Sequence, residues 1–220
     1  APGEAINLEP NNLTTTEPVD ITTQESISAP AEALQEAAGV DLTQVDEEGN
    51  TVVDPAAVGT ALAPLMTSEL TADEVAGLLF MREEEKLARD VYLYLYEQWG
   101  TPVFQNISQS EQTHMDSVQT LIDRYRLSDP TAGKAAGEFS DPELQALYDQ
   151  LTAQGSQSLA EALKVGAAIE EIDILDLQSD LALIQQADIQ QVFQNLLQGS
   201  ENHLRAFVSN LSSQTGEVYQ

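Results

Sequence analysis

The sequence contains no cysteine, few basic residues and few aromatic residues, and these shortages limit what the protein can do. Without cysteine it can form no disulfide, thiolate zinc site, iron–sulfur cluster or cysteine nucleophile. Only 8 Lys and Arg stand against 37 Asp and Glu, which gives a net charge of −29. Nucleic-acid phosphates and anionic membrane surfaces repel a protein this acidic, so we expect neither as a partner.

Long hydrophobic runs are missing as well. The longest, Val75 to Met81, is far shorter than the ~18 apolar residues of a membrane helix, so we expect no membrane insertion. There is no Gly-x-Ser-x-Gly motif of the serine hydrolases. Aromatic residues make up only 5% of the chain, so few rings are present to stack on the sugar substrate of a glycosidase.

The first part of the chain differs in composition from the rest. The first aromatic residue is Phe80 and the first basic residue is Arg82. Residues 1–66 are acidic and contain Thr-, Ser- and Pro-rich stretches, which predicts a polar N-terminal arm. Within the arm we expect a short helix over 29–40, a hairpin over 41–54 and a second short helix over 55–66.

We expect this arm to assemble the protein into a homo-oligomer, polymer or filament by docking on a neighbouring subunit. An arm that wraps on its own domain is the alternative. The chain starts Ala-Pro-Gly-Glu, which is typical of the end left after signal-peptide removal, so we expect a secreted, extracellular or cell-surface protein. The sequons at Asn12, Asn106 and Asn210 are candidates for glycosylation. Halophilic adaptation is another explanation of the acidic charge.

Residues 67–213 predict an all-α domain, followed by a C-terminal tail over 214–220. Apolar residues recur with helical spacing in four long segments, and no strand pattern follows residue 66. The long helices are expected over residues 72–98, 108–126, 158–177 and 187–212. A Gly- and Ala-rich connector and a shorter helix, opened by Pro142 and ending near Gly155, lie between the second and third. The prediction is a helical bundle of about 150 residues.

Each long helix carries a carboxylate or an imidazole on its apolar stripe. At 100° per residue the stripes contain Glu84, Glu111, His114, Glu170 and His203. Glu85 is expected to point away from the core, and Asp173 to lie at the edge of its stripe. Unpaired buried carboxylates cost several kcal/mol, and few basic residues exist to pair with them. A bound cation resolves this, and carboxylates with imidazoles suit iron, manganese or zinc rather than calcium.

For each residue alone, a hydrogen-bonded core histidine or a boundary glutamate is the simpler alternative. The combination, however, resembles the ferritin-like superfamily, whose di-iron carboxylate bundles use Glu on two helices and Glu-x-x-His on the other two. More closely, the chain resembles an uncharacterised bacterial and archaeal ferritin-like family. The matching stretches are Phe80–Tyr92, Ser110–Met115, Leu144–Tyr148, Ile169–Ile174 and Ser200–Phe207.

This resemblance implies a ferritin-like four-helix bundle with an iron or manganese site formed by Glu84, Glu111, His114, Glu170 and His203. One position departs from the pattern: Ser200 stands where the superfamily has Glu, three residues before His203. A weakened, single-metal or purely structural site is therefore an open alternative. We expect an exported structural or interaction subunit that self-assembles through its arm. The alternative is a di-iron or di-manganese oxidase, ferroxidase or peroxide-scavenging enzyme, and catalysis remains open.

Overall fold

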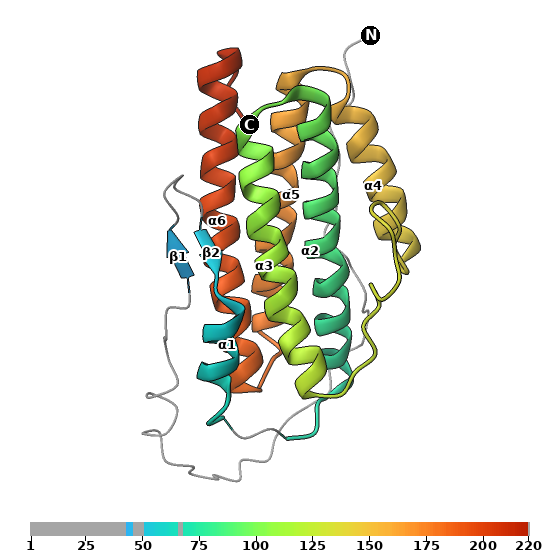
Figure 1. The fold of residues 1–220 in the computed structure, drawn as a ribbon, viewed down its shortest axis with the longest axis vertical. Coiled ribbons are helices and arrows are strands. Elements are labelled where there is room, and N and C mark those ends of the chain that lie inside the picture. The colour runs from blue at the N-terminus through green and yellow to red at the C-terminus, as the bar shows by residue number, and fades with distance from the viewer. Residues whose placement is uncertain (1–42, 46–50, 66–67, 220) are drawn as a thin grey trace, which may run out of the picture.

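The structure, a computed structural model, describes residues 43–45, 51–65 and 68–219 (Figure 1). Strands β1 (Thr43–Val45) and β2 (Thr51–Val53) form an antiparallel hairpin in which Thr43 pairs with Val53. Helix α1 (Pro55–Leu62) follows, and the Asp54 carboxylate caps it by accepting the Ala56 N–H at 2.9 Å. The predicted hairpin and second short helix are thus confirmed, whereas the helix predicted over 29–40 lies outside the described residues.

The hairpin and α1 pack on the helical body. Both β2 and α1 contact helix α3, and β2 also contacts helix α6 (Figure 1). The backbone N–H of Val53 donates to Thr113 Oγ1 at 3.1 Å, and Val58 and Leu62 are buried. This part of the predicted arm therefore contributes to the protein's own core.

Four long helices and one shorter helix form the body of the protein (Figure 1). They are α2 (Ala72–Trp99), α3 (Pro102–Arg124), α4 (Pro142–Gly155), α5 (Leu159–Leu181) and α6 (Ala187–Thr215). No strand occurs over residues 68–219, as the sequence predicts. Helix α3 begins at Pro102 rather than near Ser108. Proline fits the first turn of a helix, so the helix starts closer to the end of α2 than we predicted.

Local sequence signals place most of these helix ends. Thr71 and Glu74 form a capping box at the start of α2, where Glu74 N–H donates to Thr71 Oγ1 at 3.2 Å and Thr71 N–H donates to Glu74 Oε2 at 2.9 Å. The Ser158 side chain caps α5 by accepting a hydrogen bond from the backbone N–H of Glu161. Gly100 (φ 63°) and Gly216 (φ 75°) end α2 and α6 in the left-handed conformation that glycine adopts without strain.

The interior consists of two apolar clusters, one toward each end of the long helices. Helix α2 packs on α3 and α5 packs on α6, while α4 covers α2 and α5. The first cluster includes Val91, Leu95, Phe104, Leu163 and Phe207. The second includes Leu78, Val118, Leu177, Phe193 and Leu196. Buried polar and charged residues occupy the levels of the helices between these two clusters, so the apolar core is interrupted midway.

The connector between α3 and α4 packs against α2 through buried charges. Arg82 Nη2 lies 3.2 Å from Asp129 Oδ2, and Lys86 Nζ donates to the Ala135 carbonyl at 2.8 Å. The Glu83 carboxylate accepts a backbone N–H from Ser140. Consequently, α2 is buried on every side between Arg82 and Lys86.

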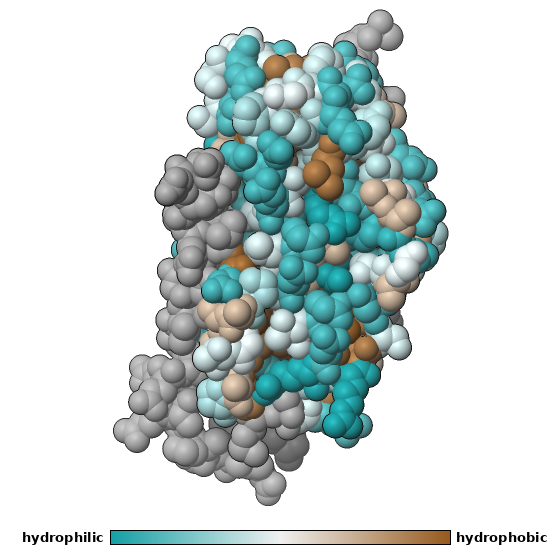
Figure 2. Space-filling view, viewed as in Figure 1, coloured by the Kyte–Doolittle hydropathy of each residue, from teal (hydrophilic) through white to brown (hydrophobic). Residues whose placement is uncertain are grey.

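The outer surface reflects the acidic composition. Hydrophilic residues cover most of the face visible in Figure 2, with only scattered hydrophobic patches. Within the described part of the chain, no helix combines the length and hydropathy that crossing a lipid bilayer requires.

Candidate metal centre

The polar layer between the two apolar clusters contains a compact group of carboxylates and imidazoles. Helix α2 contributes Glu85, α3 contributes Glu111 and His114, α5 contributes Glu170, and α6 contributes His203. All five side chains are buried. Four different helices thus direct metal-ligand side chains into one enclosed volume.

Glu111 is the geometric centre of this group. Its Oε2 lies 2.9 Å from His114 Nδ1, and its Oε1 lies 2.8 Å from His203 Nδ1. Two sets of donor atoms, each within 4.8 Å of one another, share this residue: Glu85–Glu111–His114 and Glu111–Glu170–His203. The two imidazole rings stack with centroids 5.4 Å apart. The arrangement therefore offers two adjacent cation positions with Glu111 common to both.

Several of these donor atoms have no hydrogen-bond partner, although they are buried. They include Glu85 Oε1, Glu111 Oε1 and His203 Nδ1. The last two lie 2.8 Å apart, yet they lack the alignment of a hydrogen bond. Buried polar atoms are nearly always satisfied, so such orphans need an explanation. Carboxylate oxygens and imidazole nitrogens that converge in this way fit a shared cation.

The charges in the centre also favour a cation. Burial tends to raise the pKa of Glu111, but the imidazoles of His203 and His114 hold it well below its usual range. Burial tends to lower the pKa of His203, but the carboxylates of Glu111 and Glu170 raise it to about 10. Burial, followed by the charge of Glu111, raises the pKa of Glu170 to about 7. Carboxylates therefore outnumber the imidazoles that can neutralise them.

Further contacts orient the donors. The Tyr92 hydroxyl donates to Glu170 Oε1 at 2.6 Å, and His203 Nε2 lies 2.9 Å from Ser110 Oγ. Because Nε2 of His203 faces Ser110, its Nδ1 faces the carboxylates. The ring of His114 lies against Gly199 of α6, where a Cβ atom would come within 2.6 Å of Nε2. Glycine at 199 thus leaves the space that this ring occupies.

The structure brings together four of the five residues predicted as metal ligands, namely Glu111, His114, Glu170 and His203. Glu84 is buried but belongs to neither donor set. The prediction that Glu85 points away from the core was wrong, since this side chain is buried and lies 3.2 Å from His114 Nδ1. Glu85 faces α3, whereas the connector covers Glu83 and Lys86 on the outer side of α2, so burial in this part of the helix does not follow a single stripe.

Asp173 is the second residue that sequence reasoning underestimated. It is buried in the same layer rather than lying at the edge, and its carboxylate accepts a hydrogen bond from Ser200 Oγ. Burial, followed by the charge of Glu170, raises the pKa of Asp173 to about 7. Its i, i+3 spacing from Glu170 was the available sequence signal.

Two of the three predicted glycosylation sites lie within helices rather than in surface loops. Asn106 and Asn210 are half-buried within α3 and α6, and Asn210 Nδ2 donates to the Ala206 carbonyl at 2.9 Å. Acceptor sequons are expected in surface loops, so these two positions are poor candidates. Asn12 lies outside the described residues.

Fold and site together define a helical protein with a buried carboxylate–histidine cluster. Residues 74–220 match the family described as "Uncharacterized protein domain (DUF2202)", and the chain belongs to that family. The matched span contains every residue of the cluster. The predicted resemblance to an uncharacterised family is thereby confirmed at this level.

Comparisons with individual proteins point to an archaeal relative. The chain is 46% identical over 152 residues to the uncharacterized protein MJ0754 of Methanocaldococcus jannaschii, covering 69% of this chain and 82% of that protein. It is also similar to the crystal structure of hypothetical protein MJ0754 from Methanococcus jannaschii DSM 2661, with a TM-score of 0.70. That match, at 46% identity, covers 72% of this chain and 90% of the other.

Proposed function

We propose that this protein is a ferritin-like four-helix bundle that binds two iron or manganese ions and uses them in oxidation by O₂ or peroxide. The observation that carries the proposal is the position of Glu111, whose two oxygens face two histidines from different helices at 2.8 and 2.9 Å. The Glu-x-x-His spacing of Glu111 and His114 on one of four long helices supports the same class.

The donor sets indicate which residues hold the ions. Glu85, Glu111 and His114 would hold one ion, and Glu111, Glu170 and His203 would hold the other. Bound iron or manganese supplies one-electron chemistry toward O₂ or peroxide. The protein contributes orientation: Tyr92 holds one oxygen of Glu170, and the apolar clusters on both sides limit access of bulk water.

Ser200 is the departure from the superfamily pattern, and Asp173 compensates for it. Ser200 Oγ donates to one oxygen of Asp173 across the α5–α6 contact, and the other oxygen, Oδ1, is buried without a hydrogen-bond partner. The charges of Asp173, Glu85 and Glu111 act on one another, which places Asp173 beside both donor sets. We infer that α5 supplies the carboxylate that α6 lacks, so that two metal positions are retained.

The proposed activity is tested with protein loaded with Fe(II) under anaerobic conditions and then mixed with O₂ or with H₂O₂. We expect Fe(II) to be oxidised at least about tenfold faster than free Fe(II) in the same buffer, a rise that absorbance follows. The exposed-charge variant Glu201→Gln serves as control and should match the wild type. Binding of iron without faster oxidation by either oxidant would reject the oxidase and leave a structural metal site.

The role of Asp173 is tested by comparing variants of the two residues that share the Ser200–Asp173 hydrogen bond. If Asp173 supplies the missing carboxylate, Asp173→Asn should reduce the bound metal from two ions per chain to one, because the variant loses the negative charge and carries an NH₂ group in place of one oxygen. Ser200→Ala should keep both ions with an affinity lower by about tenfold, as for loss of a supporting contact. Metal analysis with isothermal titration distinguishes the two. Equal behaviour of the variants would show that Asp173 only supports the fold.

Export and arm-mediated assembly remain predictions. They depend on residues 1–42, which lie outside the described part of the chain. Size-exclusion chromatography of a chain lacking these residues tests assembly: retention of the wild-type oligomeric state would count against it. We do not propose glycosylation at Asn106 or Asn210, because both are half-buried within helices.

A further inference from the structure

A line of acidic side chains connects the metal centre with one end of the helical body. Asp173, Asp176 and Asp180 occupy positions i, i+3 and i+7 of α5 and therefore share one helix face. They span about 10 Å along the helix axis. Glu84 and Gly77 of α2 lie opposite Asp176 and Asp180, respectively, so this line follows the contact between α2 and α5.

Burial decreases along the line. Asp173 and Glu84 are buried, with 5% and 4% of their surfaces exposed, whereas Asp176 and Asp180 are only half-buried. The charges of Asp173 and Asp176 both act on Glu84, so its carboxylate lies near both of them. Each carboxylate is therefore close to the next, from the partly exposed end of α5 to the centre.

No basic side chain of the described residues forms an ion pair with any of these four carboxylates. Glu84 Oε2 is buried and has no hydrogen-bond partner. Burial, reinforced by the charge of Asp176, raises the pKa of Asp180 to about 6. Uncompensated carboxylates disfavour folding, so a purely structural role does not account for a line of them.

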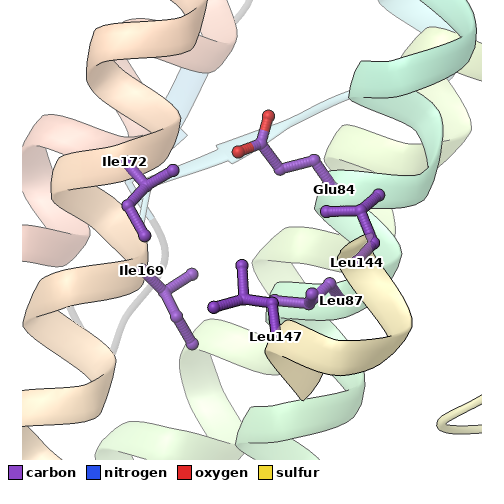
Figure 3. Close-up of a pocket in the computed structure, with 6 residues that line it drawn as sticks. All are labelled: Glu84, Leu87, Leu144, Leu147, Ile169 and Ile172. Atoms are coloured by element: carbon purple, nitrogen blue, oxygen red, sulfur yellow. The ribbon is translucent and has the colours of Figure 1, made fainter. Parts of the chain in front are cut away.

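The surroundings leave room for these side chains. A Cβ atom at Gly77 would lie 2.8 Å from Asp180 Oδ2, so only glycine gives this carboxylate its present space. Glu84 also lines a pocket between α2, α4 and α5 whose other walls are aliphatic: Leu87, Leu144, Leu147, Ile169 and Ile172 (Figure 3). Figure 3 shows the Glu84 carboxylate directed away from the leucines.

We propose that Asp180, Asp176 and Glu84 form a loading route along which divalent cations pass from the end of α5 to the metal centre. The route presupposes the two-metal centre proposed above. Carboxylates attract divalent cations, and a row of them raises the local cation concentration. Neither donor set close enough to hold an ion includes these three residues. They therefore pass cations onward rather than retain them.

Stopped-flow loading of metal-free protein with Co²⁺, followed by its visible absorbance, tests this route. The Asp176→Asn/Asp180→Asn variant should load at least about tenfold more slowly than the wild type, because attraction at the outer part of the route is lost. Its final Co²⁺ content should be unchanged. A matched control, Glu97→Gln/Asp149→Asn, changes the net charge equally at exposed positions of α2 and α4 and should load at the wild-type rate.

The outcomes separate the route from the centre. An unchanged loading rate, or equal slowing in the matched control, overturns the route. A lower final Co²⁺ content overturns it too, since these residues would then be ligands. A wild type that binds no Co²⁺ overturns the proposed centre itself. Thermal unfolding checks that the variant is folded, and Asp180→Asn alone, at the half-buried end, provides a milder second test with about threefold slower loading.

Discussion

Replacing Glu111 with Gln is expected to abolish binding of both metal ions. Glu111 belongs to both donor sets, and each of its oxygens faces a different histidine. The amide keeps the size of the side chain, but it presents an NH₂ group in place of one oxygen and carries no negative charge. Metal analysis after supplementation with Fe²⁺ or Mn²⁺ should show a fall from two ions per chain to nearly none.

A matched control removes a carboxylate elsewhere on the same body. Glu201 of α6 is partly exposed, with a loose contact of 3.8 Å to Arg205, so Glu201→Gln should retain the full metal content. Thermal unfolding gives a second readout, because an ion that binds only the folded state stabilises it. A chelator should lower the Tm of the wild type and leave that of Glu111→Gln unchanged. If Glu111→Gln kept one ion firmly, Glu111 would not be shared, and if it kept both, the centre would lie elsewhere.

Much of the helical framework can be predicted from the sequence because its signals are local. Thr71 and Glu74 mark the start of α2, Pro142 marks that of α4, and apolar residues recur at helical spacing between such signals. The hairpin can be predicted because Glu-Glu-Gly-Asn separates two short apolar runs in the sequence, and the strands on either side do pair. The start of α3 was missed, although Pro102 fits a first helical turn and Val103, Phe104 and Ile107 continue the buried apolar stripe back to it.

The site is harder to predict because its members depend on packing between distant segments. A helical wheel assumes one buried face and one exposed face, but α2 has no exposed face between Arg82 and Lys86, because the connector covers its outer side. Neighbouring residues Glu84 and Glu85 therefore both enter the interior, in different directions. One lines the pocket and meets Asp176, and the other meets His114.

The importance of Asp173 could not be predicted for a similar reason. Its stripe alone places it at an edge, but a small residue on the facing helix, Ser200, leaves room for the carboxylate and donates to it. The same substitution that weakens the sequence pattern on α6 thus makes space for a carboxylate from α5. This relation between Ser200 and Asp173 becomes visible only when the packing of α5 on α6 is known.

The largest expected loss of stability follows from Asp90→Asn. Lys86 is a buried lysine, with 2% of its side chain exposed, and its Nζ lies 2.6 Å from Asp90 Oδ2. Asp90 also accepts the Gly137 backbone N–H at 2.9 Å, so one carboxylate ties α2 to the connector. Removing the charge leaves Lys86 buried without its counter-ion, which costs about 3–5 kcal/mol in comparable pairs.

Thermal unfolding in the presence of a chelator measures this effect without a contribution from metal. At about 2–4 °C per kcal/mol for a chain of this size, the Tm should fall by about 6–20 °C. Asp149→Asn, at an exposed position of α4, is the matched control and should change the free energy of unfolding by less than about 0.5 kcal/mol. Lys86→Met should cost less than Asp90→Asn, because Arg89 still pairs with Asp90 at 2.7 Å.

Comparing the stability losses of these variants shows what the Lys86–Asp90 ion pair contributes. If Asp90→Asn matched the control, the connector would be attached by its other contacts alone, and burial of Lys86 would need another explanation. If Asp90→Asn lowered metal content as well as stability, the connector would also position the neighbouring Glu85, because Lys86 directly follows it on α2. We expect stability to fall and metal content to persist, since Glu85 is oriented by His114 from the opposite side of the helix.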